Sequence, residues 1–107
     1  MSDLIPVVGT NDFGAATSSG VVLVDFFAAW CRPCRMQLPI LEQLAPDFEG
    51  RVKFIKVDTD HAQDVAARFG IQSIPTLVIL KDGETFAQFS GLQQAETLRS
   101  TLKKAIA

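Results

Sequence analysis

Residues 21–34 read VVLVDFFAAWCRPC, an apolar run that leads directly into two closely spaced cysteines. Six of the seven residues of Val21–Phe27 are apolar, and they are mostly β-branched or aromatic. Such a run predicts a strand buried on both faces, as parallel strands usually are. Pro33 suits the first turn of a helix, where a backbone N–H would lack a partner in any case. We therefore predict a strand, a short turn and a helix that begins at the cysteines.

Strand-like and helix-like segments alternate along the rest of the chain. Further buried strands are predicted at residues 52–57 and 76–80, and residues 5–8 form a candidate edge strand because they contain a proline. Asp82 and Gly83 separate two apolar runs and predict a hairpin. Parallel crossovers together with one hairpin predict an α/β fold, in which a mixed sheet carries helices on both faces in three layers.

Apolar periodicity predicts the helices. A weak helix starts near residues 10–11 and runs towards residue 18, and a long one ends before Gly50 with a kink at its internal Pro39. A third starts at Asp60, with a glutamine at capping-box spacing, and a fourth ends in basic residues that suit the helix dipole. The apolar stripes of the last three are Met36, Ile40, Leu44 and Phe48; Ala62, Val65, Ala66 and Phe69; and Ala95, Leu98, Leu102 and Ala105.

Cys31 and Cys34 are the candidate reactive residues. At a helix start, unpaired N–H groups and the positive dipole end favour a thiolate at Cys31, the species that attacks disulfides. We expect Cys31 to be the more exposed sulfur and the nucleophile, and Cys34 to be more buried and to resolve the intermediate. The alternatives are two structural cysteines or half of a zinc site. Zinc prefers four ligands, and His61 is the only other soft ligand, so no metal is expected.

Length and charge narrow the class of protein. The chain has 107 residues and a net charge of −2, which predicts one domain over residues 1–107 and no surface for nucleic acid. No apolar run reaches the roughly 18 residues of a membrane span, and the N-terminus lacks the basic region of a secretory signal. Two cysteines are too few for a disulfide-stapled secreted scaffold. We expect a cytoplasmic protein that binds no membrane.

The chain resembles the thioredoxin family over essentially its whole length. The matching residues are Val24-Asp25-Phe26, Trp30-Cys31, Pro33-Cys34, Gly70-Ile71, Ile74-Pro75-Thr76, Lys81-Asp82-Gly83 and Gly91. The resemblance implies a five-stranded mixed sheet with four helices and a monomer that reduces protein disulfides through its own dithiol. It also implies no further cofactor, and re-reduction by a flavin- and NADPH-dependent thioredoxin reductase.

The resemblance also implies a role for a carboxylate inside the first buried strand. Burying an ionised carboxylate is costly, so the pKa of Asp25 should rise unless a cation pairs with it. In the family, the matching Asp lies beneath the dithiol and takes the proton of the resolving cysteine through water, and the matching lysine is Lys56. The alternative is an Asp25–Lys56 ion pair with a purely structural role.

A substrate groove is implied in the same way. The family keeps the proline matching Pro75 in the cis form, facing the dithiol, although the sequence by itself predicts trans. An extended substrate then pairs with the preceding backbone. The implied groove residues are Trp30, Pro33, Ser73, Ile74, Pro75 and Gly91, with core packing as the alternative for Trp30.

Two residues depart from the family pattern. Arg32 replaces the usual glycine, and either stabilises the Cys31 thiolate or points into solvent and biases partner choice towards acidic surfaces. Phe27 stands where many members have tryptophan, which affects packing behind the site. Two other functions remain open: an oxidase or isomerase of an oxidising compartment, for which Arg32 is the only indication, and a binding module without redox chemistry.

Overall fold

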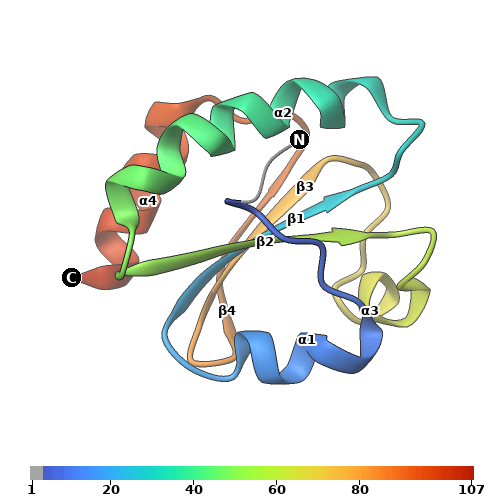
Figure 1. The fold of residues 1–107 in the computed structure, drawn as a ribbon, viewed down its shortest axis with the longest axis horizontal. Helices are drawn as coiled ribbons and strands as arrows, with labels where there is room; N and C mark the ends of the chain where they lie inside the picture. The colour runs from blue at the N-terminus through green and yellow to red at the C-terminus, as the bar shows by residue number, and fades with distance from the viewer. Residues whose placement is uncertain (1–3) are drawn as a thin grey trace.

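The structure, a computed structural model, describes residues 4–107. Helices and strands alternate as the sequence predicts until the final hairpin (Figure 1). In chain order the elements are α1 (Thr10–Thr17), β1 (Val21–Phe27), α2 (Arg32–Leu44), the 3-10 helix η1 (Ala45–Phe48), β2 (Val52–Asp58), α3 (Gln63–Arg68), β3 (Thr76–Lys81), β4 (Glu84–Ser90) and α4 (Ala95–Ile106).

One mixed sheet forms the middle layer, with strand order β2-β1-β3-β4. β1 pairs with β2 in parallel, and β3 is antiparallel to both of its neighbours. Helices α2 and α4 cover one face, and α1 and α3 cover the other (Figure 1). The three-layer α/β architecture is therefore confirmed.

The strand β1 lies at the centre because both of its faces are apolar. Val21 and Leu23 pack in the core beneath α2 and α4, whereas Val22, Val24 and Phe26 pack in the core above α1 and α3. This strand ends just before the cysteines, so two apolar cores hold the position of the turn that carries them.

The fifth strand is the part of the fold prediction that was wrong. Residues 5–8 make one isolated bridge, Val7 with Lys56, and the sheet within residues 4–107 has four strands. The Lys56 N–H donates to the Pro6 carbonyl and the Val8 N–H donates to the Lys56 carbonyl, each at 2.9 Å. Pro6 has no N–H to continue the ladder in the other direction, which limits the pairing to this one step.

Two helix boundaries also differ from the prediction. The long helix becomes a 3-10 turn at Ala45, where Pro46 removes an α-helical hydrogen bond. Helix α3 begins at Gln63, and its N-cap residue is Ala62, which gives no side-chain cap. Asp60 lies before the helix, and its Oδ2 accepts a hydrogen bond from the Trp30 indole. The predicted hairpin is present, and Asp82 and Gly83 both have positive φ, at 51° and 85°. Helix α2 continues through Pro39, so the kink stays a prediction.

Candidate active site

Cys31 and Cys34 form a disulfide at the N-terminus of α2, with their Cα atoms 5.3 Å apart. Cys31 is the N-cap residue, and its Sγ accepts a hydrogen bond from the Cys34 backbone N–H at 3.2 Å. The same sulfur lies 3.8 Å from the Ile74 carbonyl oxygen. Once the disulfide is reduced, the Cys34 N–H and the positive end of the helix dipole point at the Cys31 sulfur, and both favour a thiolate there.

The two cysteines do not differ in exposure as predicted. Each is 4% exposed, because Ala28, Phe27 and Ile74 pack against the pair. The expectation of a more exposed Cys31 is therefore wrong for the disulfide form. What distinguishes the sulfurs in this structure is the capping position of Cys31.

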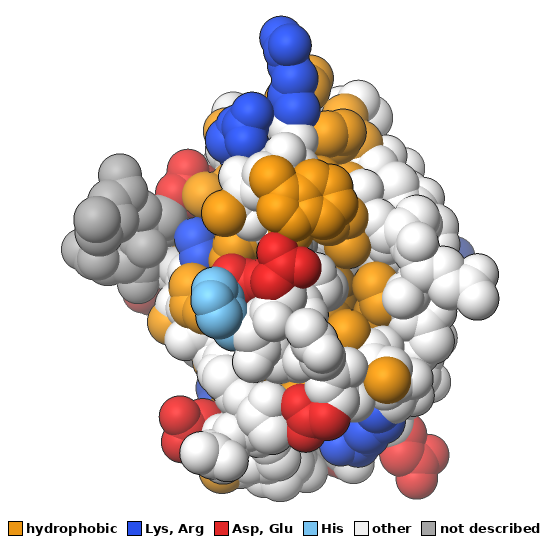
Figure 2. Space-filling model, turned by 90° about the vertical axis from the view of Figure 1, so that its right-hand side faces the viewer, with side chains coloured by type: hydrophobic (Ala, Val, Ile, Leu, Met, Phe, Trp, Pro, Cys, Tyr) orange, Lys and Arg blue, Asp and Glu red, His pale blue; other side chains and the backbone are white. Residues whose placement is uncertain are grey.

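Around the disulfide the surface is apolar and open. Trp30 is 70% exposed, and its indole N–H donates to Asp60 Oδ2 at 2.9 Å, so its side chain is no part of the core. Arg32 and Pro33 are exposed on the first turn of α2. Figure 2 shows this end of the molecule, with hydrophobic side chains between basic ones above and acidic ones below, beside the chain's one histidine.

The segment before β3 forms the other side of the site. The Ile74–Pro75 peptide bond is cis, as the family resemblance implies. Ile74 packs against the cysteines, and Pro75 is buried with its carbonyl accepting from the Gly91 N–H at 2.7 Å. Ser73 is exposed, and its carbonyl accepts from the Thr76 hydroxyl. The structure thus packs Ile74 against the disulfide, joins Gly91 to the next residue, Pro75, and leaves Ser73 exposed.

Asp25 lies in β1 with only 1% of its surface exposed. Within residues 4–107, no side chain or backbone group forms a hydrogen bond with its Oδ1. Burial raises the pKa of Asp25 from 3.8 to about 7, and the positive charge of Lys56 opposes part of that rise. The sequence-based expectation of a raised pKa is confirmed.

Lys56 is the partner of Asp25 in the β1–β2 register but does not form an ion pair with it. Its ammonium lies 5.7 Å from the centroid of the Phe27 ring. The alternative of a satisfied structural pair therefore does not describe this site. Phe27, at the position where the family often has tryptophan, holds the lysine by a cation–π contact.

A cavity of about 220 Å³ connects these groups with the disulfide. Asp25 and Lys56 line it together with Cys34, and Arg35 lies at its edge, where its guanidinium donates to the Ala29 carbonyl. This volume has room for several water molecules. The buried carboxyl and the inner cysteine thus share one solvent-sized space.

Comparison with known proteins gives one consistent result. The thioredoxin family model matches residues 6–104. A thioredoxin from Staphylococcus epidermidis is 44% identical over 97 residues, which cover 91% of this chain and 93% of the relative. A Staphylococcus aureus thioredoxin is 45% identical over 93 residues, which cover 87% and 89%. The chain belongs to the thioredoxin family.

Solved thioredoxins have the same fold. The crystal structure of Malassezia sympodialis thioredoxin has a TM-score of 0.84 at 30% identity and covers 96% of this chain and 91% of its own. A mutant thioredoxin from Halobacterium salinarum has a TM-score of 0.85 at 36% identity, with 96% and 90% covered. With its cysteine pair at disulfide distance, the chain is a dithiol–disulfide oxidoreductase.

Membership of the thioredoxin family defines the partners in general terms. Thioredoxins act on disulfides in proteins, are re-reduced by a thioredoxin reductase with NADPH, and work through their own dithiol. Among residues 4–107, no three His, Cys, Asp or Glu side chains are grouped so that they could hold a metal ion. No helix in that part of the chain is long and apolar enough to cross a membrane.

The sequence did not predict the positions that three residues on or near α2 take in the structure. Asp60 was interpreted as a helix cap but contacts Trp30, and Met36, predicted to face the core, is 55% exposed. Gln37 is fully buried one turn after Cys34. A polar residue within the apolar register of α2 was the available signal for Gln37, whereas the Asp60 contact depends on tertiary structure.

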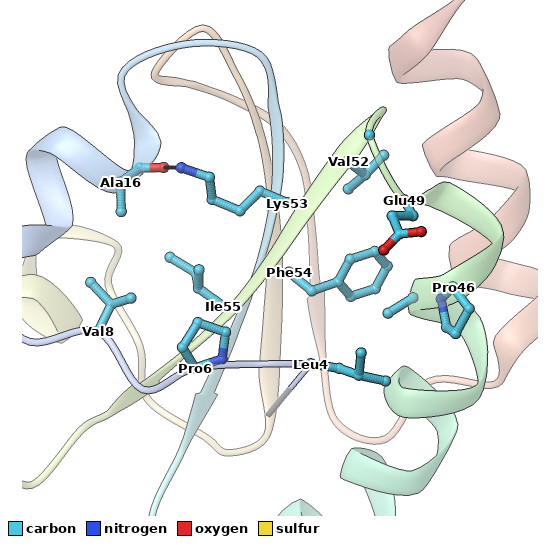
Figure 3. Close-up of a pocket in the computed structure, with 12 residues that line it drawn as sticks. Leu4, Pro6, Val8, Ala16, Pro46, Glu49, Val52, Lys53, Phe54 and Ile55 are labelled. Atoms are coloured by element: carbon cyan, nitrogen blue, oxygen red, sulfur yellow. Dashed lines mark hydrogen bonds between the residues drawn. The ribbon is translucent and has the colours of Figure 1, made fainter. Parts of the chain in front are cut away.

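A separate apolar groove of about 500 Å³ lies between the N-terminal segment, β2 and η1 (Figure 3). Its charged lining residues are Glu49 and Lys53, and the Lys53 ammonium donates to the Ala16 carbonyl. Cys31, Cys34 and Asp25 are not among the residues that line it, and neither are the residues of the predicted substrate groove. This groove is therefore separate from the disulfide site.

Proposed function

We propose that this chain is a monomeric, one-domain reductant of protein disulfides in the cytoplasm, with Cys31 as nucleophile and Cys34 as resolving residue. The Cys31 thiolate attacks one substrate sulfur, forming a mixed disulfide and releasing the other substrate sulfur as a thiolate. Cys34 then loses its proton and attacks the Cys31 sulfur. The Cys31–Cys34 disulfide forms, the second substrate sulfur leaves, and two electrons have moved to the substrate.

The observation that carries this order of attack is the capping position of Cys31. Its sulfur accepts the Cys34 N–H at the start of a 13-residue helix, whereas Cys34 lies one turn inside. Negative charge is stabilised at a helix N-terminus by roughly 0.3–1 kcal/mol at exposed sites and more at partly buried ones. Cys31 therefore has the greater share of thiolate in the reduced protein.

Asp25 is the proposed proton acceptor for Cys34. Its carboxyl has a pKa of about 7, so at neutral pH both protonation states are populated. The shared cavity of about 220 Å³ holds water that carries the proton between Cys34 and Asp25. Lys56 acts at longer range, because its charge lowers the pKa of Asp25 without pairing with it.

The surface beside the disulfide is the proposed docking groove for an extended substrate segment. Such a segment pairs with the backbone before Pro75 and covers the apolar surface around Cys31. Arg32 is exposed at the rim, so we assign it to partner choice, favouring substrates with acidic residues near their disulfide. The groove residues are Trp30, Arg32, Pro33, Ser73, Ile74, Pro75 and Gly91.

A trapping experiment tests the order of attack. The variant Cys34→Ser should accumulate a covalent mixed disulfide with a protein substrate through Cys31, because no second thiol resolves it. The matched variant Cys31→Ser should form none at neutral pH. Equal trapping by both variants, or trapping by Cys31→Ser alone, would contradict the assigned roles.

The redox potential separates a reductant from an oxidase of the same fold. Equilibration with glutathione buffers measures it directly. A reductant requires a dithiol potential well below about −200 mV, and a value above that limit contradicts the proposal. Replacing Arg32 by glycine should lower the potential by no more than about 30 mV, the value of one pKa unit at one sulfur.

A further inference from the structure

Gln37 is the one buried polar side chain of α2, with 0% of its surface exposed among residues 4–107. An amide is costly to bury unless its hydrogen-bonding groups are paired. Gln37 Nε2 donates to the Gln93 carbonyl at 3.0 Å, and Gln37 Oε1 accepts from the Gln93 N–H at 2.8 Å. One side chain thus pairs with both backbone groups of a residue 56 positions away.

Gln93 belongs to the loop that connects β4 with α4, and that loop contains Gly91 of the proposed substrate groove. Its side-chain amide donates to the Ser90 and Gly91 carbonyls at 3.3 and 3.2 Å. The Gly91 N–H in turn donates to the Pro75 carbonyl at 2.7 Å. The loop is therefore bonded on one side to the Pro75 segment and on the other to α2 through Gln37.

These bonds form a connection that leads from α2 back to the disulfide. Starting from α2, the connection runs through Gln37 to Gln93, then Gly91 and Pro75, and ends at the Ile74 carbonyl, 3.8 Å from Cys31 Sγ. Gln37 and Cys34 lie on the same helix, so the Gln37 bonds tie the loop directly to the helix that carries the cysteines.

We propose that Gln37 is a positioning residue that holds the loop at residues 91–93 against α2 and so sets the width of the substrate groove. This inference rests on the docking groove proposed above. The Gln37 amide is neutral and bonds to the loop, so its loss alters docking of a protein substrate and leaves the reactivity of the dithiol unchanged.

The variant Gln37→Met removes both hydrogen bonds and keeps an unbranched side chain of similar length that helices tolerate. With insulin as the protein disulfide and dithiothreitol as reductant, we expect its KM to rise at least threefold while kcat stays within twofold. Reduction of the small aromatic disulfide DTNB should also stay within twofold. Gln43→Met is the matched control, because Gln43 is an exposed glutamine on the same helix, outside the β4–α4 loop, and it should leave both substrates unaffected.

Three readouts separate a positioning role from a general structural one. The rate of Cys31 alkylation by iodoacetamide and the dithiol potential should match the parent in folded Gln37→Met. An unchanged KM for insulin in that folded variant overturns the proposal. A rise in KM accompanied by an equal change in alkylation or DTNB reduction also overturns it, because Gln37 would then act on the dithiol.

Amide hydrogen exchange of the unmodified protein tests the bond independently of any variant. The Gln93 N–H should be protected to the same degree as the core amides of α2, since a buried side chain accepts it. Exchange at the rate of an exposed loop amide overturns the proposal even if Gln37→Met fails to fold. If the parent protein reduces neither insulin nor DTNB, the proposed reductant function fails, and hydrogen exchange still tests the bond by which Gln37 holds the loop.

Discussion

Two buried polar side chains near the cysteines, Gln37 and Asp25, differ in whether their polar atoms are hydrogen-bonded. Gln37 on α2 has both ends of its amide paired with the Gln93 backbone. Asp25 on β1 is equally buried, yet no group among residues 4–107 bonds to its Oδ1, and its pKa rises to about 7. A satisfied neutral amide fixes the position of a loop, whereas an unsatisfied carboxyl exchanges a proton near neutral pH.

Burying the Asp25 carboxyl without a partner costs stability, and the proton transfer that we propose gives a reason for it. Pairing Asp25 with a close cation would lower its pKa and make it a weaker base for the proton transfer from Cys34 that we propose. The structure instead places the Lys56 ammonium over the Phe27 ring. The four predictions that follow each change either Asp25, its neighbour Lys56, or Gln37.

Replacing Asp25 by asparagine should raise the free energy of unfolding at pH 8 by about 4 kcal/mol, the value of a pKa that rises from 3.8 to about 7. Between the two pKa values, 3.8 and about 7, the folded state holds a proton that the unfolded chain releases. The stability of the parent therefore falls as the pH rises through this range. Urea unfolding at pH 5 and pH 8 measures the gap, which should shrink at the lower pH. A gap independent of pH would contradict the assigned titration.

The control for this comparison is Asp12→Asn, which removes an exposed carboxylate of α1. Substitutions at exposed positions usually change stability by no more than about 0.5 kcal/mol. The stability of this variant should therefore follow the parent at both pH values.

The same Asp25→Asn variant should reduce insulin roughly 100-fold more slowly at pH 7.5, the lower end of what positioned proton transfer contributes. The loss should appear in kcat, because resolution by Cys34 needs the proton acceptor. Alkylation of Cys31 in the reduced variant should change much less, since the capping geometry is intact. Full turnover in Asp25→Asn would assign the proton of Cys34 to another group.

Replacing Gln37 by methionine should lower the free energy of unfolding by about 2 kcal/mol, because the Gln93 N–H and carbonyl lose their partner. The Gln37 amide does not titrate, so this loss should be the same at pH 5 and pH 8, in contrast to Asp25→Asn. Urea unfolding of Gln37→Met and of the control Gln43→Met measures it. A loss that varies with pH would mean that the variant disturbs Asp25 as well.

The smallest of the four effects is expected for Lys56→Met. Lys56 lowers the pKa of Asp25 through its charge, so removing that charge should raise this pKa further. The pH range over which stability declines should then extend upwards. If the range stays unchanged or moves downwards, the charge of Lys56 does not act on Asp25, and only its cation–π contact with Phe27 accounts for a lysine at this position.

The sequence predicts the cysteine-bearing part of the fold well, because that signal is local. The apolar run Val21–Phe27 specifies a buried strand, and Pro33 between the cysteines specifies a helix start. The raised pKa of Asp25 also follows from one carboxyl among apolar neighbours. In contrast, the cis form of Pro75 comes only from the family resemblance, since a single sequence favours trans.

The remaining differences arise from tertiary contacts that no short pattern contains. Asp60 has the spacing of a helix cap, but its carboxylate accepts a hydrogen bond from the indole N–H of Trp30, thirty positions earlier. Cys31 begins a helix, yet Ile74 from a distant loop covers it. The partner of Gln37 lies 56 positions away, so its role could be found only in the folded chain.

A direct test of this account is the titration of the Asp25 carboxyl carbon by NMR in the disulfide form of the protein. We predict a midpoint of about pH 7, because burial without a hydrogen-bond donor disfavours the charged carboxylate. A midpoint near the ordinary value of 3.8 would contradict the account, since Asp25 would then be fully ionised and unable to hold the proton of Cys34 at neutral pH.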